Sequence, residues 1–523
     1  MPVRGVFQIG VRWRFFATPL GSRLLVAIAA VASAVLFTRV YPGPLYAYQI
    51  VGGDQLYFRY ATHAVWGELP YVSIGMEYPP LALVPFGLPR LLTADPFVWE
   101  RLYTWEMLAW NWLALALLGW ATLRQGRSLV RTLGLYLLAL VAIGPLITQR
   151  YDLVPAVLAL LAMVAYQDGR YREAWLAVAV GALTKLYSLV LVPLFLIDLW
   201  RRRERGALLF GLASLAALSL AAAAGVVFLP MPMQRLFGYH WGRGAEVESL
   251  YANLGLLAHV LGGSPSAAYY GAGSVNLAAP LTDALTPYST AITAAGLLSV
   301  YAAYYLGWPR HRGQPRALFA YGTASILVFI LGNKVLSPQY LIWLLPLLPL
   351  AGSGLANLLF LVAAALTALI YPAHFQEFYT ATPLVVGMLT ARNLLLIAVC
   401  FLLLGDRRQQ GAPVDGRWLP LLRQVHRGSS VALATFCLSF PLLYLLPAPP
   451  SIPVYGRPDY DHDGEVSVLE AYVSWRGGID YDGNGEIDAQ EHRIFLTRGL
   501  DVLDDGFIDG DEYRIFFNQW PPR

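Results

Sequence analysis

Apolar stretches long enough to cross a lipid bilayer recur along this chain from residue 24 to residue 447. A transmembrane helix needs roughly 20 apolar residues. Only 13% of the 523 residues are charged, whereas soluble domains carry about 25%. We therefore expect an all-α fold, a polytopic bundle of about thirteen membrane helices. The predicted spans are 24–41, 98–122, 130–147, 152–167, 173–186, 187–200, 206–229, 289–307, 316–331, 338–352, 354–371, 382–404 and 431–447.

The arginines gather in the short loops between alternate spans, which is the pattern of the positive-inside rule. The N-terminal segment, residues 1–23, is then cytoplasmic, and the basic charge points to a membrane and not to nucleic acid. The other loops expected inside are 124–127, 167–172, 201–205, 308–316 and 405–427. Three long connections are expected outside: 42–97, 231–288 and 371–383.

Two interpretations make this topology work. The segment from Tyr78 to Leu92 contains four prolines, which argue against one continuous helix, so we expect it to lie at the interface. We also expect the apolar stretch 174–200 to break at Lys185 into two short spans. The alternative, one long helix over its second part, would place Arg124, Arg127 and Arg170 outside.

Ionisable residues beside the outer connections are candidates for function, because charge near a membrane span is costly. The chain has only two lysines, Lys185 and Lys334. With Arg150 and Arg243 they would form a basic cluster suited to a lipid-linked phosphate. The alternative is that each long side chain merely reaches the interface.

Two further residues of the outer connections have both a functional and a structural interpretation. Asp54 follows the first span and could act as a general base, or it could cap the helix expected over 55–66. His240, in the sequence Tyr-His-Trp, could bind substrate or could be a packed aromatic residue.

Short sequence words in these connections resemble the glycosyltransferase C superfamily, and in particular the polyprenyl-phosphate-mannose-dependent glycosyltransferase family 87. The resemblance covers about residues 20–405. The matching words are Gly-Asp-Gln at 53–55, Glu-Leu-Pro-Tyr at 68–71, Tyr-Pro-Pro-Leu at 78–81, Thr-Lys-Leu-Tyr at 184–187, Arg-Gly followed by Glu-Ser within 243–249, and Ser-Pro-Gln-Tyr at 337–340.

The resemblance implies an inverting transfer of a sugar, mannose by analogy, from a polyprenyl-phosphate donor to a hydroxyl of a lipid or glycan acceptor. It implies that Asp54 is the catalytic base. No Asp-x-Asp pair stands in the first outer connection, so no metal is expected at the catalytic site. The candidate substrate-binding residues are Arg150, Lys185, His240, Arg243, Glu248, Lys334, Gln339 and Tyr340.

The C-terminal segment from Tyr455 is a separate acidic module, with 16 acidic and 6 basic residues. It contains two full matches to the EF-hand pattern D-x-[DN]-x-[DN]-G-x5-E, in which oxygens at loop positions 1, 3, 5, 7, 9 and 12 bind Ca²⁺. A third copy at 501–512 has Leu503 in place of an oxygen ligand. The expected ligands are Asp459, Asp461, Asp463, Glu465, Ser467 and Glu470, then Asp480, Asp482, Asn484, Glu486, Asp488 and Glu491.

The sequence therefore predicts a membrane domain over 24–447, a proline-rich linker over 448–458 and an extracytoplasmic EF-hand-like calcium-binding domain over 459–523. A bacterial plasma membrane fits best, because no retention signal is present. A multi-pass transporter or lipid-handling protein with a calcium-binding tail is the alternative function. Its expected sign, an internal repeat of helices broken by glycine or proline, is not found in the sequence.

Overall fold

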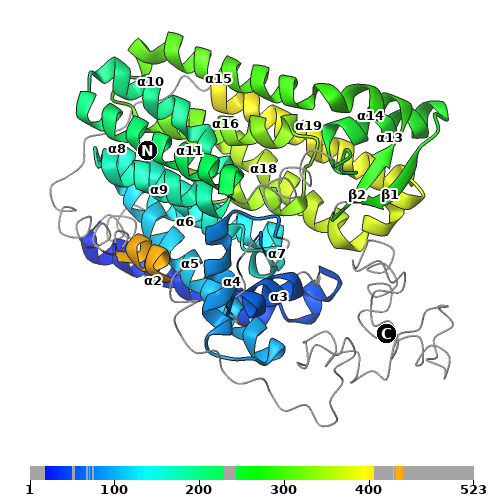
Figure 1. The fold of residues 1–523 in the computed structure, drawn as a ribbon, viewed down its shortest axis with the longest axis horizontal. Coiled ribbons are helices and arrows are strands. Elements are labelled where there is room, and N and C mark those ends of the chain that lie inside the picture. The colour runs from blue at the N-terminus through cyan, green and yellow to red at the C-terminus, as the bar shows by residue number, and fades with distance from the viewer. Residues whose placement is uncertain are drawn as a thin grey trace, which may run out of the picture.

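The fold is taken from a computed structural model, which describes residues 18–49, 54–65, 67, 69, 71–72, 76–228, 243–271, 273–405, 424, 428 and 431–439. Within these residues the chain is mostly helical (Figure 1). The predicted linker and the predicted EF-hand-like domain lie outside them, so neither enters the description below.

The longer helices follow the apolar stretches of the sequence. The helices of the first half are α2 (Pro19–Val35), α3 (Asp54–Val65), α4 (Leu83–Arg90), α5 (Pro96–Arg124), α6 (Leu129–Ile143), α7 (Leu146–Gln149), α8 (Leu153–Gln167), α9 (Tyr171–Thr184), α10 (Val192–Arg202) and α11 (Arg205–Phe228). Those of the second half are α13 (Leu250–Gly262), α14 (Pro280–Leu285), α15 (Ser289–His311), α16 (Pro315–Gly332), α17 (Leu348–Ala351), α18 (Gly354–Ala368) and α19 (Pro383–Gly405).

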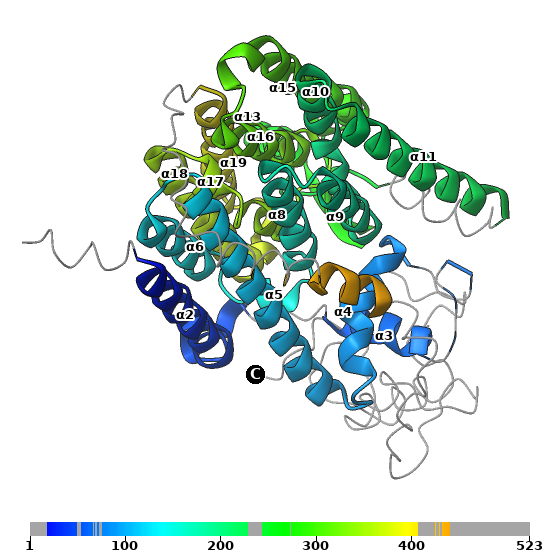
Figure 2. The ribbon, with the colours of Figure 1, turned by 90° about the vertical axis from the view of Figure 1, so that its left-hand side faces the viewer.

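Six of the described helical stretches are long and apolar enough to cross a membrane, judged by length and composition. They are Pro19–Val40, Arg205–Gly225, Pro280–Arg310, Pro315–Gly332, Gly354–Ala373 and Pro383–Gly405. Helix α11 lies at the edge of the bundle (Figure 2) and exposes a series of leucines, among them Leu209 and Leu220. Exposed leucines in such numbers fit a lipid surrounding better than water. The described helices therefore suit a multi-pass membrane protein, while the total of thirteen spans stays a prediction.

The mostly helical structure agrees with the all-α prediction, and it also contains a short hairpin in the connection 231–288. Strands β1 (Ala267–Gly271) and β2 (Ser274–Ala278) form an antiparallel hairpin in which Ala267 pairs with Ala278. A hydrogen bond from the Val247 amide to the carbonyl of Val275, 3.0 Å long, ties the hairpin to the chain before α13. The described part of this connection, residues 243–271 and 273–288, is thus folded.

The predicted helix break at Lys185 is confirmed. Helix α9 ends at Thr184, Lys185 is extended with φ −160° and ψ 122°, and the 3-10 helix η4 (Leu186–Leu191) follows directly. The proline-rich segment after Tyr78 forms a 3-10 turn, η3 (Pro80–Ala82), and the eight-residue helix α4. Eight helical residues rise only about 12 Å, so α4 is too short to cross a bilayer, as the prolines predicted.

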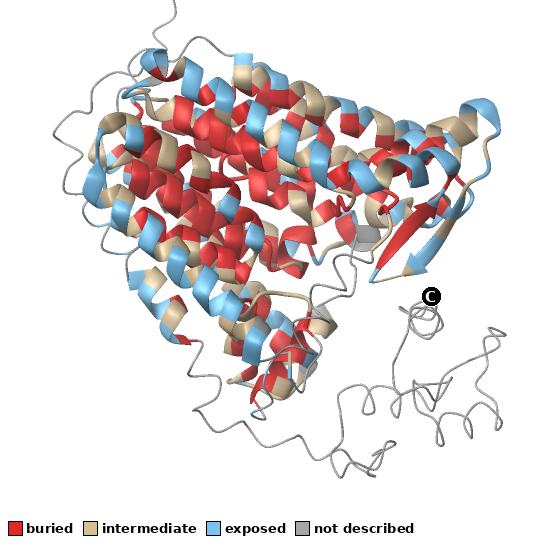
Figure 3. Ribbon diagram, turned by 45° about the horizontal axis from the view of Figure 1, so that its top comes forward, coloured by how far each residue is buried: buried red, intermediate tan, exposed pale blue. Residues whose placement is uncertain are grey.

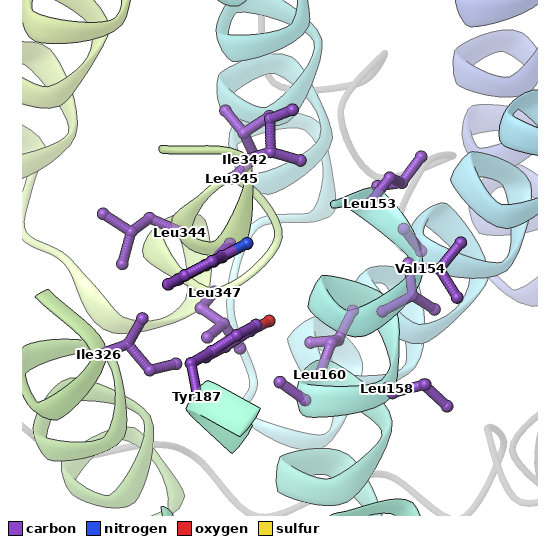
Figure 4. Close-up of a cluster of buried hydrophobic side chains, with 14 of the residues drawn as sticks. Leu153, Val154, Leu158, Leu160, Tyr187, Ile326, Ile342, Leu344, Leu345 and Leu347 are labelled. Atoms are coloured by element: carbon purple, nitrogen blue, oxygen red, sulfur yellow. The ribbon is translucent and has the colours of Figure 1, made fainter. Parts of the chain in front are cut away.

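The largest core cluster fills the centre of the bundle (Figure 3). In it Tyr187 lies among side chains that include Leu160, Ile326 and Leu344 (Figure 4). The ring of Tyr187 stacks on Trp343 with 4.0 Å between centroids, and Tyr340 stacks on the same indole at 4.2 Å. Trp343 and Tyr340 both belong to the 3-10 helix η6 (Pro338–Leu344). Because η4 and η6 are packed together in this way, the Lys185 break has a fixed position.

The antiparallel pair α8 and α9 defines two ends of the bundle. At the first, which we call the Lys185 end, the Tyr151 hydroxyl donates to the Thr184 carbonyl at 3.4 Å. At the other, the arginine end, Arg124 forms an ion pair with Asp168 at 2.8 Å.

The predicted outer and inner loops named below gather at opposite ends of the bundle. Parts of all three predicted outer connections meet at the Lys185 end, and loops 124–127 and 167–172 meet at the arginine end. Figure 1 shows α13, α14 and the hairpin at the right of the molecule, with α10 at the left.

Candidate functional site

Lys185 is fixed at the helix break by an ion pair and by aromatic rings. Its Nζ lies 2.6 Å from Oδ1 of Asp152, and the two side chains are 14% and 1% exposed. Ring faces attract a cation within about 6 Å. Four ring centroids lie within that distance of Nζ: Tyr151 at 4.8 Å, Trp343 at 5.3 Å, Tyr340 at 5.4 Å and Tyr78 at 5.9 Å. The lysine is therefore held in place and is not a freely moving surface cation.

Asp152, just before α8, joins three parts of the chain. Its Oδ1 also accepts a hydrogen bond from Trp343 Nε1 at 2.6 Å. Its Oδ2 makes no hydrogen bond within the described residues. A buried carboxylate oxygen without a hydrogen bond costs free energy, and the Asp152 side chain is only 1% exposed, so Asp152 holds Lys185 and Trp343 from inside the bundle.

An aromatic wall from α3 and α4 borders this lysine. Tyr57 of α3 stacks on Phe86 of α4 with 4.2 Å between centroids, and it meets the edge of Tyr151 at 5.6 Å. Asp54 is the first residue of α3, three positions before Tyr57. The structure therefore places the backbone of Asp54 beside the Lys185 end, while its side chain is outside the described part of the chain.

Arg150 and Glu77 add charge next to Lys185. The Arg150 Nη2 donates to the Tyr371 hydroxyl at 3.3 Å. The Tyr60 hydroxyl donates to Glu77 Oε2 at 3.1 Å. The Arg150 cation and the Glu77 carboxylate both interact electrostatically with the Lys185 ammonium group. The first cation pair, Arg150 and Lys185, therefore has two carboxylates near it, those of Asp152 and Glu77.

A second cation pair, Arg243 and Lys334, lies on the segments before α13 and after α16. Lys334 Nζ donates to the Arg243 carbonyl at 2.6 Å, and the Glu246 amide donates to the Lys334 carbonyl at 2.9 Å. The Ser337 hydroxyl donates to Glu246 Oε1 at 2.8 Å. Burial lowers the pKa of Lys334, and the charge of Arg243 lowers it further. Burial also raises the pKa of Glu246, against the effect of Arg243.

Tyr340 connects the two cation pairs. Its ring lies under Lys185, and the charges of Arg243, Glu246 and Asp152 act on its hydroxyl. We call the connected set the Tyr340 cluster; it consists of Glu77, Arg150, Asp152, Lys185, Arg243, Glu246, Lys334 and Tyr340. Four cations and three carboxylates leave one positive charge in excess when all are ionised. The cluster contains carboxylates beside the four basic residues that the sequence analysis named.

Glu248 lies next to this cluster and is paired with an arginine of α19. Its carboxylate forms an ion pair with Arg392, and both side chains are fully buried. Arg392 Nη2 also donates to the Glu248 carbonyl at 2.7 Å. Burial raises the pKa of Glu248 to about 7, against the effect of Arg392. Glu248 therefore anchors the start of α13 to α19, and its predicted role in substrate binding stays a prediction.

Of the remaining predicted residues, the structure describes only Gln339. Gln339 precedes Tyr340 in η6 and is partly exposed. His240 and all twelve predicted calcium ligands, from Asp459 to Glu491, lie outside the described residues. Within the described part of the chain, no group of three or more His, Cys, Asp or Glu side chains is arranged to hold a metal ion.

Sequence reasoning missed Asp152 and Trp343 as site residues. Asp152 could have been recognised from the sequence, because a carboxylate directly before an apolar stretch is costly and usually has a function. Trp343 had none, since it lies inside an apolar stretch and 191 positions from its hydrogen-bond partner.

Comparison with known proteins finds no family model that matches the chain and no curated protein with a similar sequence. The resemblance to glycosyltransferase family 87 thus rests on the sequence words and stays a prediction.

Proposed function

We propose that the protein is a membrane glycosyltransferase that transfers a sugar, mannose by analogy, from a polyprenyl-phosphate donor to an acceptor hydroxyl at the outer membrane face. The observation that carries the proposal is that Lys185 and Arg243 both lie close to Tyr340, with Arg150 next to Lys185 and Lys334 next to Arg243. These four residues come from four separate segments of the chain. Such convergence is what binding of one anionic headgroup requires.

The charge of the Tyr340 cluster suits this donor. A sugar attached to a polyprenyl phosphate is a phosphodiester with one negative charge, which equals the excess positive charge of the cluster. The leaving phosphate gains negative charge as its bond to the sugar breaks, and preorganised cations stabilise that change. Arg243 can offer two parallel N–H groups to phosphate oxygens.

In the proposed reaction the Asp54 carboxylate takes the proton of the acceptor hydroxyl. The hydroxyl oxygen attacks the anomeric carbon from the face opposite the phosphate, which inverts that centre. The bond between that carbon and the phosphate oxygen breaks, and the polyprenyl phosphate leaves with both bonding electrons.

The proposal includes the finer topology. Thirteen spans would place the Tyr340 cluster outside and the arginine end inside, in a bacterial plasma membrane. The C-terminal EF-hand-like domain would then bind extracytoplasmic Ca²⁺ and serve a structural or docking role.

The test is transfer by the purified chain in proteoliposomes supplied with radiolabelled polyprenyl-phosphate mannose and membrane lipid acceptors. Loss of a general base reduces rate by about 10²–10⁴-fold, and we expect that loss for Asp54→Asn. The matched control is Asp283→Asn, at an exposed carboxylate of α14, which should keep wild-type activity. Full transfer by Asp54→Asn would reject the assignment of the base.

A further inference from the structure

One folded part of the connection 231–288 contains almost no charge. The 39 residues from Leu250 to Tyr288 include a single formally charged residue, Asp283. They form α13, the hairpin of β1 and β2, α14 and the 3-10 turn η5 (Thr286–Tyr288). We call them the hairpin unit; all but residue 272 are described. A soluble domain carries about 25% charged residues, which would be about ten here. The hairpin unit therefore has the composition of a segment that lies against an apolar surrounding.

Large apolar side chains lie on the surface of the hairpin unit. In α13, Leu254 is 45% exposed and Leu261 is 81% exposed. These two residues are two helical turns apart, so they lie on the same face of α13. In α14, Leu281 and Asp283 are both exposed, and two positions correspond to a rotation of about 200° around the helix. The apolar and the charged side chain of α14 thus lie on opposite sides of that helix.

The helix that follows the hairpin fixes the depth of this unit in the membrane. The stretch Pro280–Arg310, which joins α14 to α15, has 31 residues and is long and apolar enough to cross a bilayer. At 1.5 Å per residue it is about 46 Å long, whereas the hydrocarbon core is about 30 Å thick. Tyr288 and Trp308 lie about 30 Å apart along it, and tyrosine and tryptophan gather at the two boundaries of the core. The hairpin unit, which precedes Tyr288, is therefore at the level of the lipid headgroups.

Backbone hydrogen bonds attach the hairpin unit to the Tyr340 cluster. The Leu277 amide of β2 donates to the Ala245 carbonyl at 2.9 Å, and the amide of the next residue, Glu246, donates to the Lys334 carbonyl at 2.9 Å. A change in the depth of the hairpin unit would therefore move Glu246 and Lys334 with it.

We infer that the hairpin unit binds the lipid surface at the Lys185 end, with Leu254, Leu261 and Leu281 in the layer between headgroups and acyl chains. Interfacial segments bury their apolar side about 5–10 Å deep in this layer. The partner is the bilayer and not another protein, because α15 continues from the unit and exposes Leu298 and Leu306 along a candidate span. The contact sets the height of the Tyr340 cluster relative to the lipid phosphates, and it does not depend on sugar transfer.

Single spin labels on the full chain in proteoliposomes test this inference. The background is Cys400→Ala/Cys437→Ala, in which the chain has no cysteine of its own. The measured quantity is the ratio of two collision rates of the label, with oxygen, which dissolves in lipid, and with a water-soluble nickel chelate. The labels are attached in turn at Leu254→Cys, Leu261→Cys and Leu281→Cys.

Asp283→Cys is the matched control, because it carries the label on the opposite side of α14, and Leu298→Cys on α15 is the reference for a label in lipid. We expect the ratio to be at least about fivefold higher at the three leucine positions than at Asp283, because polar solutes partition out of apolar surroundings. Equally low ratios at Leu281 and Asp283 would place the hairpin unit in water and overturn the inference. Labels at positions 254 and 261 that neither reagent reaches would indicate a protein contact, such as a second copy of the chain, and would overturn it as well.

Photolabelling of the unsubstituted chain tests the same contact without any cysteine variant. A lipid-soluble diazirine should label peptides of 250–288 about as strongly as peptides of the predicted span 289–307, since both would contact lipid. Labelling confined to 289–307 would overturn the inference. Neither measurement involves the sugar donor, so both results are independent of whether the protein transfers a sugar.

Discussion

Replacing Asp152 by asparagine removes the charge that holds Lys185 at the centre of the Tyr340 cluster. The substitution keeps the size of the side chain and keeps an oxygen that can accept the Trp343 N–H. It removes the ion pair of 2.6 Å between two side chains that are 14% and 1% exposed. The change therefore isolates the electrostatic part of the interaction.

The expected cost follows from burial. Removal of one partner of a buried ion pair costs about 3–5 kcal/mol, because an uncompensated charge remains. The four rings around Lys185 still attract the ammonium group, so we expect the lower limit, about 3 kcal/mol. The double variant Asp152→Asn/Lys185→Met leaves no unpaired charge. Its cost should be about 2 kcal/mol less than the sum of the two single costs.

The assay is denaturation in detergent micelles. The readout of unfolding is the reaction of the buried Cys400 with a thiol reagent. The free energy of unfolding comes from linear extrapolation to zero denaturant. Glu377→Gln is the control, since its pair with His374 is about one-third exposed and surface ion pairs contribute little to stability. A cost below about 1 kcal/mol for Asp152→Asn, or additive costs in the double variant, would refute this reasoning.

Two further predictions concern pH and calcium. Because the pKa of Lys334 is lowered, this lysine loses its proton at a lower pH than an ordinary lysine does, and phosphate binds the protonated form. The KM for the donor should therefore rise toward alkaline pH in the wild type and less so in Lys334→Arg, and coincident pH profiles would contradict that role. Isothermal titration of the full chain with Ca²⁺ should reveal two sites with dissociation constants on the order of 0.1–1 mM. Asp480→Ala should leave one site, and absence of binding heat in the wild type would contradict the EF-hand interpretation.

The features that the sequence predicted well depend on local rules. The helix break at Lys185 and the short helix α4 follow from a charge and from prolines within apolar stretches. The grouping of outer and inner segments at two ends follows from the arginine distribution, which needs no knowledge of side-chain packing.

The features that the sequence did not predict depend on contacts between distant positions. The bond between Trp343 and Asp152 joins residues 191 positions apart, and neither η6 nor α8 carries a pattern that specifies it. The sequence could not tell whether Glu246 or Glu248 forms a buried ion pair, and the reason is a different one. The two residues are neighbours in one segment, and only the position of Arg392 in α19 decides which one is buried in an ion pair.

The most direct test of the account is photo-crosslinking of the donor to the full chain. A polyprenyl-phosphate sugar with a photoreactive group beside the phosphate would be irradiated with the protein in proteoliposomes, and the adducts located by mass spectrometry of peptides. The account predicts adducts within 150–187 and 334–343 that unmodified donor suppresses. Adducts confined to segments of the arginine end, such as 124–127 and 167–172, with none near Tyr340, would contradict it.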